Sequence, residues 1–342
     1  MDDAGISKRI SAQLKGEIGV YGVVIASASG KILCSRNSNL PFMTASLYKL
    51  ILMADIYRKI ERGSLSQQDA IELDWSVFSD DGEAYFGWDQ IGNAYPIQEY
   101  LYATGAYSSN AGAWTLLTLT SADDLAQTAA DIGLTRTFIM TDLSTLPSWP
   151  FPGGADAIGD DDDLATAFVE SWSNWDTLTN ITTPRDMAIY FHALITNTLL
   201  SPWISKQIAD ILSQQQVRDR IPALLPANTV TINKTGNLEG IVNDAGIVEL
   251  ASGPRIIVLL SEAMPSDTRA TLILQRLALI ATGVTVIPPL DVPNPEGLDA
   301  IDSTDPAAWY PGANGTDGDA EATPDAPDGD QNEPPDVDND GT

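Results

Sequence analysis

Three short motifs along the chain carry side chains that can act together on a carbonyl group. Ser46 and Lys49 lie three residues apart in an apolar stretch that we predict to be helical, so both side chains lie on one face. A serine hydroxyl is a weak nucleophile until a neighbouring group takes its proton. The spacing therefore predicts that Ser46 is a nucleophile and that Lys49 accepts its proton.

The other two motifs are Ser108-Ser-Asn110 and, further along the chain, Lys234-Thr-Gly236. Each motif has a purely structural interpretation, because serine and asparagine favour helix N-caps and a lysine can end an ordinary strand. A serine three residues before a lysine is also common in helices. The presence of all three motifs, in this order, favours one shared catalytic site.

The composition fits an enzyme and argues against several other classes of protein. The chain has 342 residues, 44% of them hydrophobic, which is enough for one large core or two joined sub-domains. Its formal net charge of −29 repels phosphate backbones, so we expect no nucleic-acid partner. Cys34 and His192 are the only cysteine and histidine, which excludes an internal disulfide and a zinc site built from several such ligands.

The hydrophobic patterns predict the elements that position the motifs. Helices are expected at 6–18, 45–62, 97–103, 109–119, 121–132, 184–197, 201–213 and 268–281, and strands at 20–26, 31–36, 230–235, 243–250 and 255–261. Strands near both ends predict one antiparallel sheet in an α/β (α+β) fold, with residues 45–222 as a large helical insertion. A cleft between the sheet and the helices would bring the three motifs together.

The last part of the chain differs in composition from the rest. Residues 287–342 contain 15 Asp and Glu, no Lys or Arg, and ten of the 21 prolines. A segment of this kind cannot bury enough apolar surface to offset its ordering entropy. We therefore expect a folded domain over residues 1–285 and an acidic, disordered tail over residues 286–342.

The chain contains no apolar run long enough to span a bilayer, which needs about 18 residues. Met1-Asp-Asp leads directly into the first predicted helix, without the pattern of a signal peptide. We therefore expect no membrane span and no signal segment in this chain, which we also expect to act as a monomer.

Taken in order, the three motifs resemble those of class A β-lactamases and penicillin-binding proteins, over about residues 5–283. The segments Thr182–Ala188 and Gly240–Gly246 resemble further parts of the same superfamily, the penicillin-recognising serine hydrolases. The resemblance implies a β-lactamase/transpeptidase-like fold, a reaction that needs no cofactor, and an extracytoplasmic location.

The resemblance also implies a role for the residues that carry out acylation. Lys49 would take the proton of Ser46, and the charge of Lys234 would help to keep the Lys49 amine neutral. Ser108 would relay a proton to the leaving nitrogen. The backbone N–H groups of Ser46 and Asn237 would form the oxyanion hole.

Other residues of the same motifs would bind the substrate. Asn110 would hold the side-chain amide of the substrate, while Lys234 and Thr235, next to Gly236, would bind its carboxylate. One position departs from the family pattern, because Ser109 stands where class A enzymes usually carry Asp. This substitution removes a negative charge from the loop.

The sequence leaves the deacylation base open. Class A enzymes activate a water with a Glu that is followed by an Asn four residues later, and Glu170 with Asn174 matches that spacing. The usual neighbours of that pair are missing, and Asp142 is the other candidate. If neither residue serves, Ser46 would be acylated but would release the acyl group slowly.

Three functions fit these observations. We favour a serine hydrolase that opens β-lactams through an acyl-Ser46 intermediate, an activity that would confer antibiotic resistance. The second is a D,D-peptidase that acts on D-Ala-D-Ala-type cell-wall peptides by the same acylation. The third is a non-catalytic module that binds wall fragments or β-lactams, which the loss of Ser46, Lys49 or Lys234 would have indicated.

Overall fold

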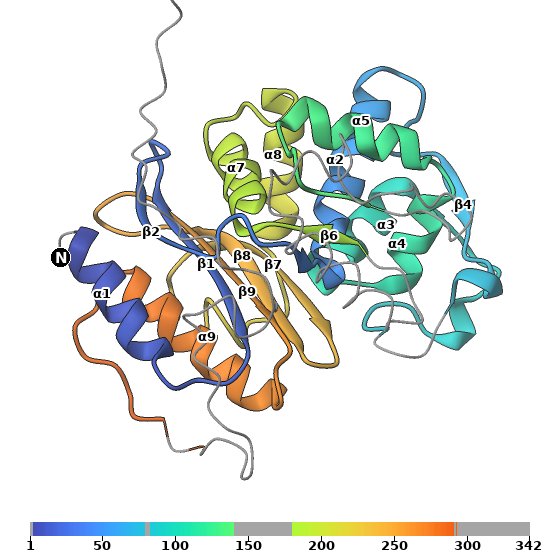
Figure 1. Cartoon of the computed structure of the whole chain (residues 1–342). Helices are drawn as coiled ribbons and strands as arrows, with labels where there is room; N and C mark the ends of the chain where they lie inside the picture. The colour runs from blue at the N-terminus through green and yellow to red at the C-terminus, as the bar shows by residue number, and fades with distance from the viewer. Residues whose placement is uncertain (1–2, 79–82, 140–179, 291, 293–342) are drawn as a thin grey trace, which may run out of the picture.

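A five-stranded antiparallel sheet is built from the two ends of the chain. The computed structural model describes residues 3–78, 83–139, 180–290 and 292. The sheet has the order β2-β1-β9-β8-β7, as Figure 1 shows. Its strands are β1 (Val20–Ser27), β2 (Ile32–Arg36), β7 (Thr231–Leu238), β8 (Ile241–Val248) and β9 (Arg255–Glu262).

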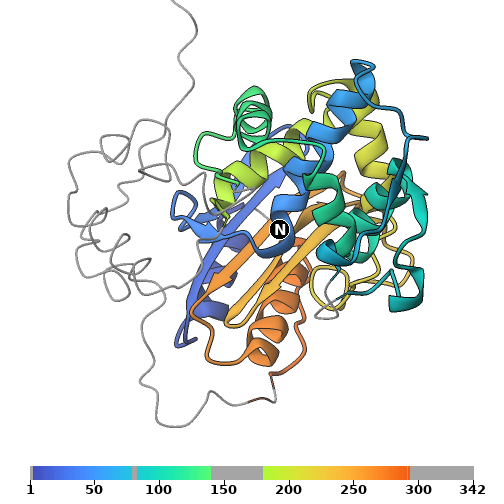
Figure 2. The ribbon, with the colours of Figure 1, turned by 90° about the vertical axis from the view of Figure 1, so that its right-hand side faces the viewer.

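Two pairs of helices cover the two faces of this sheet. The helices α1 (Asp3–Leu14) and α9 (Asp267–Ala281) pack together on one face, and α7 (Pro184–Ile195) and α8 (Pro202–Leu212) lie against the other. Figure 2 shows α9, in orange, below the strands, and α7 and α8, in yellow-green and yellow, above them. Strands β8 and β9 are buried along almost their whole length because helices cover both faces of the sheet.

The helical part lies beside the sheet between β2 and β7 in the sequence. Its α-helices are α2 (Lys49–Glu61), α3 (Ile97–Tyr102), α4 (Asn110–Leu117) and α5 (Ala122–Ile132). Short helical turns join them, namely η1 (Ala45–Tyr48), η2 (Trp75–Val77), η3 (Trp88–Gln90) and the π-helical η4 (Ala103–Tyr107). Two small antiparallel pairs complete it: β3 (Phe42–Met43) with β6 (Ile181–Thr182), and β4 (Ala70–Glu72) with β5 (Ala94–Pro96).

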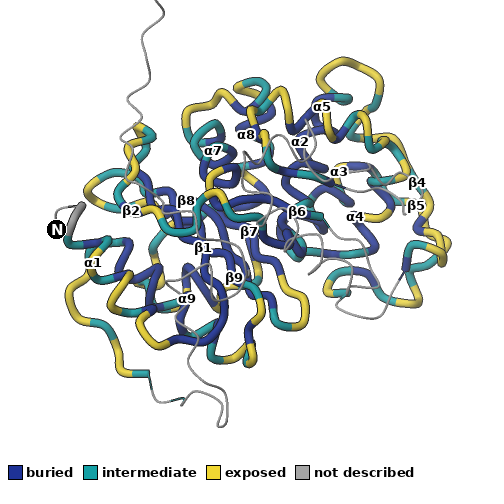
Figure 3. The backbone as a smooth tube through the Cα atoms, viewed as in Figure 1, coloured by how far each residue is buried: buried dark blue, intermediate teal, exposed yellow. Residues whose placement is uncertain are grey.

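Helix α2 is the central helix of this part, and its residues 49–58 are all buried. In Figure 3 its backbone is dark blue, whereas β4 at the outer edge is largely exposed. Asp55 on α2 has no exposed surface and accepts hydrogen bonds from Arg58, Thr120 and Thr128 at 2.9, 2.6 and 2.8 Å. This carboxylate therefore ties α2 to α5 through side chains that are themselves largely buried.

The structure confirms the predicted fold class, an antiparallel sheet from both chain ends with a large helical insertion. The predicted helix at 45–62 is divided, because a 3₁₀ turn precedes the α-helix that begins at Lys49. After α9, the partly buried Ile287 and Leu290 pack against the core that α1 and α9 share with the sheet. Most of the predicted tail lies outside the described residues. Within those residues, no helix is long and apolar enough to cross a membrane.

Replacing Asp55 by alanine should destabilise the protein by about 3 kcal/mol, because the buried Arg58 guanidinium would lose one of its two carboxylate partners and two threonine hydroxyls would lose their acceptor. Urea unfolding followed by circular dichroism measures this change. The matched control is Asp210→Ala, which removes the exposed pair with Lys206 and should cost less than about 0.5 kcal/mol. Equal losses in the two variants would contradict the role of Asp55.

Candidate active site

Ser46 lies at the turn between β3 and α2, in a backbone that is held tightly. The preceding Ala45 has a φ of 44°, a left-handed conformation that non-glycine residues adopt rarely and at an energetic cost. Ser46 itself is half-buried on the 3₁₀ turn η1, one turn before Lys49. The sharp turn therefore presents the Ser46 side chain at the surface of an otherwise buried helix.

Strand β7 lies directly against this turn, and Gly236 allows the close approach. A β-carbon added at Gly236 would lie 2.7 Å from the Thr44 carbonyl oxygen and 3.1 Å from the Ser46 nitrogen. Any larger residue would push the strand away from Ser46. β7 is also an edge strand of the five-stranded sheet, and an edge strand keeps backbone N–H and C=O groups available to an extended ligand.

The amine of Lys49 is buried and points to the Ser108–Asn110 loop. Lys49 has no exposed surface, and its Nζ donates to the Ser108 carbonyl oxygen at 2.5 Å and to Asn110 Oδ1 at 2.8 Å. Burial lowers the pKa of Lys49 to about 7, while the charge of Glu83 acts in the opposite direction. A substantial fraction of the Lys49 amine is therefore neutral near pH 7 and able to accept a proton.

The Ser108 hydroxyl lies between two lysine amines. Lys234 Nζ donates to Ser108 Oγ at 2.8 Å, and Lys49 Nζ is 3.5 Å from the same oxygen. The π-helical turn η4 and the left-handed φ of 64° at Ser108 set this orientation, because they aim both the hydroxyl and the carbonyl at the amines. The three motifs predicted from the sequence therefore meet at this point.

Lys234 is also fully buried, and it donates a second hydrogen bond to the Thr235 carbonyl oxygen at 2.8 Å. Burial, followed by the charge of Lys49, lowers the pKa of Lys234 well below its usual value. Burial is likewise the cause that lowers the pKa of Lys49, so desolvation accounts for this shift, and not the like-charge repulsion from Lys234 that the sequence suggested. The like-charge effect acts instead on Lys234, whose pKa the charge of Lys49 lowers further.

Two neighbouring glutamines join the parts of the chain that form the site. Gln215 is buried, and its Nε2 donates to the Gly105 carbonyl oxygen at 3.1 Å and the Asn233 carbonyl oxygen at 3.4 Å. Gly105 belongs to η4 and Asn233 to β7, so this one side chain joins the Ser108 turn to the lysine strand. The neighbouring Gln216 N–H also bonds to the Ala106 carbonyl oxygen at 2.8 Å.

A buried polar network lies at the end of β7. Arg220 is 2% exposed and donates to Asn237 Oδ1 and, at 3.3 Å, to the Asn243 carbonyl oxygen. Asp244 accepts from Asn233 Nδ2 at 2.9 Å, and burial raises the pKa of Asp244 to about 7. The guanidinium of Arg220 places a second cationic group next to the exposed Asn237.

The residues predicted from the sequence thus divide into two groups. The structure brings together eight of them, namely Ser46, Lys49, Ser108, Asn110, Lys234, Thr235, Gly236 and Asn237. The two candidate deacylation bases, Glu170 and Asp142, lie outside the described residues. Sequence reasoning missed Glu83, Gln215 and Arg220, because single polar residues in aperiodic segments carry no local signal of their tertiary partners.

With this geometry established, comparison with known proteins identifies the family. A family model described as the β-lactamase enzyme family matches residues 5–284. The chain belongs to the β-lactamase enzyme family. A comparison with curated protein sequences gave no match.

Solved structures of this family share the fold. A β-lactamase from Sphaerobacter thermophilus is 23% identical with a TM-score of 0.64, covering 84% of this chain and 100% of its own. A β-lactamase from Xanthomonas campestris is 21% identical with a TM-score of 0.67, covering 82% and 97%. A mutant of PBP-A, an acyl-enzyme complex with penicillin G, is 18% identical with a TM-score of 0.64, covering 82% and 96%. At these identities the likeness shows the fold alone.

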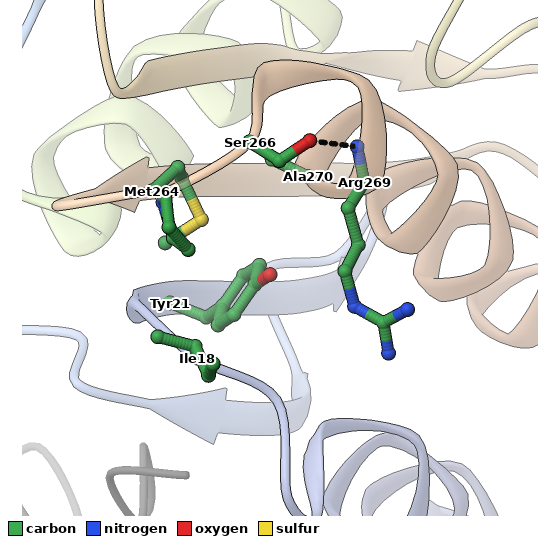
Figure 4. Close-up of a pocket in the computed structure, with 7 residues that line it drawn as sticks. Ile18, Tyr21, Met264, Ser266, Arg269 and Ala270 are labelled. Carbon is green, nitrogen blue, oxygen red and sulfur yellow. Dashed lines mark hydrogen bonds between the residues drawn. The ribbon is translucent and has the colours of Figure 1, made fainter. Parts of the chain in front are cut away.

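A separate recess lies on the face of the sheet that α1 and α9 cover. It lies between the start of β1 and the start of α9, where Tyr21 and Met264 face each other and the Ser266 hydroxyl caps α9 at the Arg269 N–H (Figure 4). The space does not admit a water molecule. Arg269 is also paired with Glu17 at 2.7 Å, so this recess is part of the helix packing and not of the site.

Replacing Gln215 by alanine should lower the free energy of unfolding by about 1–3 kcal/mol, because two buried carbonyl groups would lose their donor. The same variant should react more slowly with a fluorescent penicillin, since η4 and β7 would no longer be fixed to each other. The exposed neighbour Gln216→Ala is the control, and its stability should change by less than about 0.5 kcal/mol. Matching losses in both variants would contradict the bridging role.

Proposed function

We propose that this β-lactamase-family protein is an active-site serine hydrolase that attacks the β-lactam amide with Ser46. The observation that carries the proposal is the Ser108 hydroxyl, which lies between the buried amines of Lys49 and Lys234. Acyl transfer to a serine needs a base for the nucleophile and an acid for the leaving nitrogen. These three side chains are suited to supply both.

In the first step, the Ser46 oxygen bonds to the lactam carbonyl carbon while its proton passes to the neutral Lys49 amine. The lowered pKa of Lys49, about 7, fits a base that works near neutral pH. The C–N bond of the ring then breaks, and the nitrogen takes the hydroxyl proton of Ser108. Lys49 and Lys234 both lie within reach of Ser108 Oγ and return a proton to it.

The negative charge on the carbonyl oxygen would be stabilised by the backbone N–H groups of Ser46 and Asn237. Each such donor is often worth about 3 to 4 kcal/mol in the transition state. The contact of Gly236 with the Ser46 nitrogen supports this assignment, because it brings the two backbones side by side. A substrate carboxylate near Lys234 and Thr235 would favour the charged form of the Lys234 amine.

The fate of the acyl group separates the two enzymatic functions. Hydrolysis with Glu170 as the base would make the protein a class A β-lactamase-like enzyme, which we favour. Slow release would make it a D,D-carboxypeptidase/transpeptidase-like enzyme acting on cell-wall peptides. Both substrates occur outside the cytoplasm, and we propose the same location for this protein.

The purified protein should open a chromogenic cephalosporin, and intact-mass spectrometry should detect an acyl adduct that Ser46→Ala abolishes. Fast colour change with a short-lived adduct supports β-lactam hydrolysis, while a stable one-to-one adduct supports the peptidase alternative. Ser35→Ala, which alters an exposed serine on β2, is the matched control and should behave like the wild type. An adduct that persists in Ser46→Ala would refute the nucleophile assignment.

The acylation rate should fall as the pH drops below about 7, by about tenfold per pH unit, because protonated Lys49 cannot accept the proton of Ser46. Stopped-flow measurement of adduct formation between pH 5 and 9 tests this. His192→Ala, which removes the only histidine of the chain, is the control. Loss of the acidic limb in that variant would contradict its assignment to Lys49.

A further inference from the structure

The loop that carries Ser108 has Ser109 where class A enzymes usually carry Asp, yet it is firmly held. Ser109 is fully buried and caps α4 by accepting the Gly112 N–H at 2.8 Å. A hydroxyl can take this single bond but brings no negative charge to balance the two lysine amines nearby. The loop therefore needs another acceptor for its remaining donors.

Glu83, from a segment 25 residues earlier in the chain than Ser108, supplies this acceptor. Its Oε2 accepts the Ser109 hydroxyl at 3.0 Å and the Ala111 N–H at 2.9 Å. Its Oε1 accepts the N–H groups of Tyr85 and Phe86 at 2.9 and 3.1 Å. One carboxylate thus fixes its own segment with one oxygen and the catalytic loop with the other.

The same segment contacts the loop through aromatic rings. The Tyr85 ring lies 4.9 Å from the Tyr107 ring between centroids, in an edge-on arrangement, and Tyr107 directly precedes Ser108. The loop is therefore held on both sides of Ser108, by ring packing before it and by carboxylate hydrogen bonds after it. A shift of Glu83 would be transmitted to the Ser108 carbonyl and the Asn110 amide, the two acceptors of Lys49.

The negative charge of Glu83 also affects the pKa of Lys49, the proposed base. Among the causes that set the pKa of Lys49, the negative charge of Glu83 opposes the effect of burial. Glu83 therefore influences Lys49 in two ways, through the position of its hydrogen-bond acceptors and through its charge.

We propose that Glu83 is the positioning residue of this active site, the carboxylate that replaces the missing acidic residue at position 109 and holds the Ser108–Asn110 loop on Lys49. This inference rests on the proposed acylation of Ser46. Glu83 acts through the loop and through Lys49 and does not itself touch the substrate.

The first test is Glu83→Gln, which keeps the size of the side chain but not its four-fold acceptor character. A glutamine accepts only through Oε1, so its NH₂ group would face two N–H or O–H donors. Acylation by a fluorescent penicillin should slow by about 10- to 100-fold, because the catalytic groups are misplaced. Glu72→Gln, which removes an exposed carboxylate on β4, is the matched control and should leave the rate unchanged.

The pH profile separates positioning of the base from general stabilisation. Without the Glu83 charge the pKa of Lys49 should fall further, so the acidic limb of acylation should move to lower pH in Glu83→Gln. If Glu83→Gln acylates more slowly but the acidic limb of its pH profile stays at the same pH, Glu83 has only a structural role, whether or not the melting temperature also falls.

The second test places a carboxylate at position 109 in place of the one at position 83. Ser109→Asp alone should slow acylation, because the new carboxylate would lie close to Glu83, whose Oε2 is now 3.0 Å from the Ser109 hydroxyl. In the Glu83→Gln background the same substitution should recover at least about tenfold of the rate and return the acidic limb toward its original pH. Failure of the double variant to recover either quantity would overturn the inference.

If the wild-type protein forms no adduct at all, the proposed function fails. If Glu83→Gln forms the adduct as fast as the wild type, only the role of Glu83 is refuted.

Discussion

The active site depends on the burial of two lysine amines beside one serine hydroxyl. Lys49 and Lys234 have no exposed surface, and both lie within 3.5 Å of Ser108 Oγ. Burying an amine disfavours its charged form, and for Lys234 the nearby charge of Lys49 adds to that effect. Both amines therefore lose their protons more readily than a lysine in water, and the pKa of Lys49 falls to about 7.

This arrangement requires fixed hydrogen-bond acceptors and burial of both amines, and the rest of the fold provides both. The acceptors for Lys49 lie on the Ser108–Asn110 loop, while Lys234 is carried by the edge strand β7. Gln215 joins these two parts, and the central helix α2 is fixed to its neighbours by Asp55. The antiparallel sheet holds β7 in register through its pairing with β8.

Close backbone packing is a second constraint on the site. The turn at Ala45 adopts a left-handed conformation, and Gly236 lets β7 lie against the Ser46 nitrogen. Strain of this kind persists only where the surrounding structure determines the backbone. Here that surrounding structure is the β3–β6 pair on one side and β7 on the other.

The sequence by itself determined the strands and helices whose patterns are local. The apolar run of β9 and the four-residue spacing of Ile6, Ile10 and Leu14 are readable without a structure, because period and composition reflect which face is buried. The ordered motifs likewise predicted that Ser46, Lys49 and Lys234 belong together. The 3₁₀ turn at η1 was missed, since its apolar composition continues into α2.

Only the tertiary structure decided the pKa values of the lysine amines and which residues hold the site in place. Burial is a property of packing, so the lowered pKa of Lys49 could not be derived from its spacing to Ser46. Glu83 and Gln215 lie in aperiodic segments, and their partners are far away in the sequence. A carboxylate can replace one lost at position 109 from any segment that folds next to it, because hydrogen bonding and charge depend on distance in space and not on order along the chain.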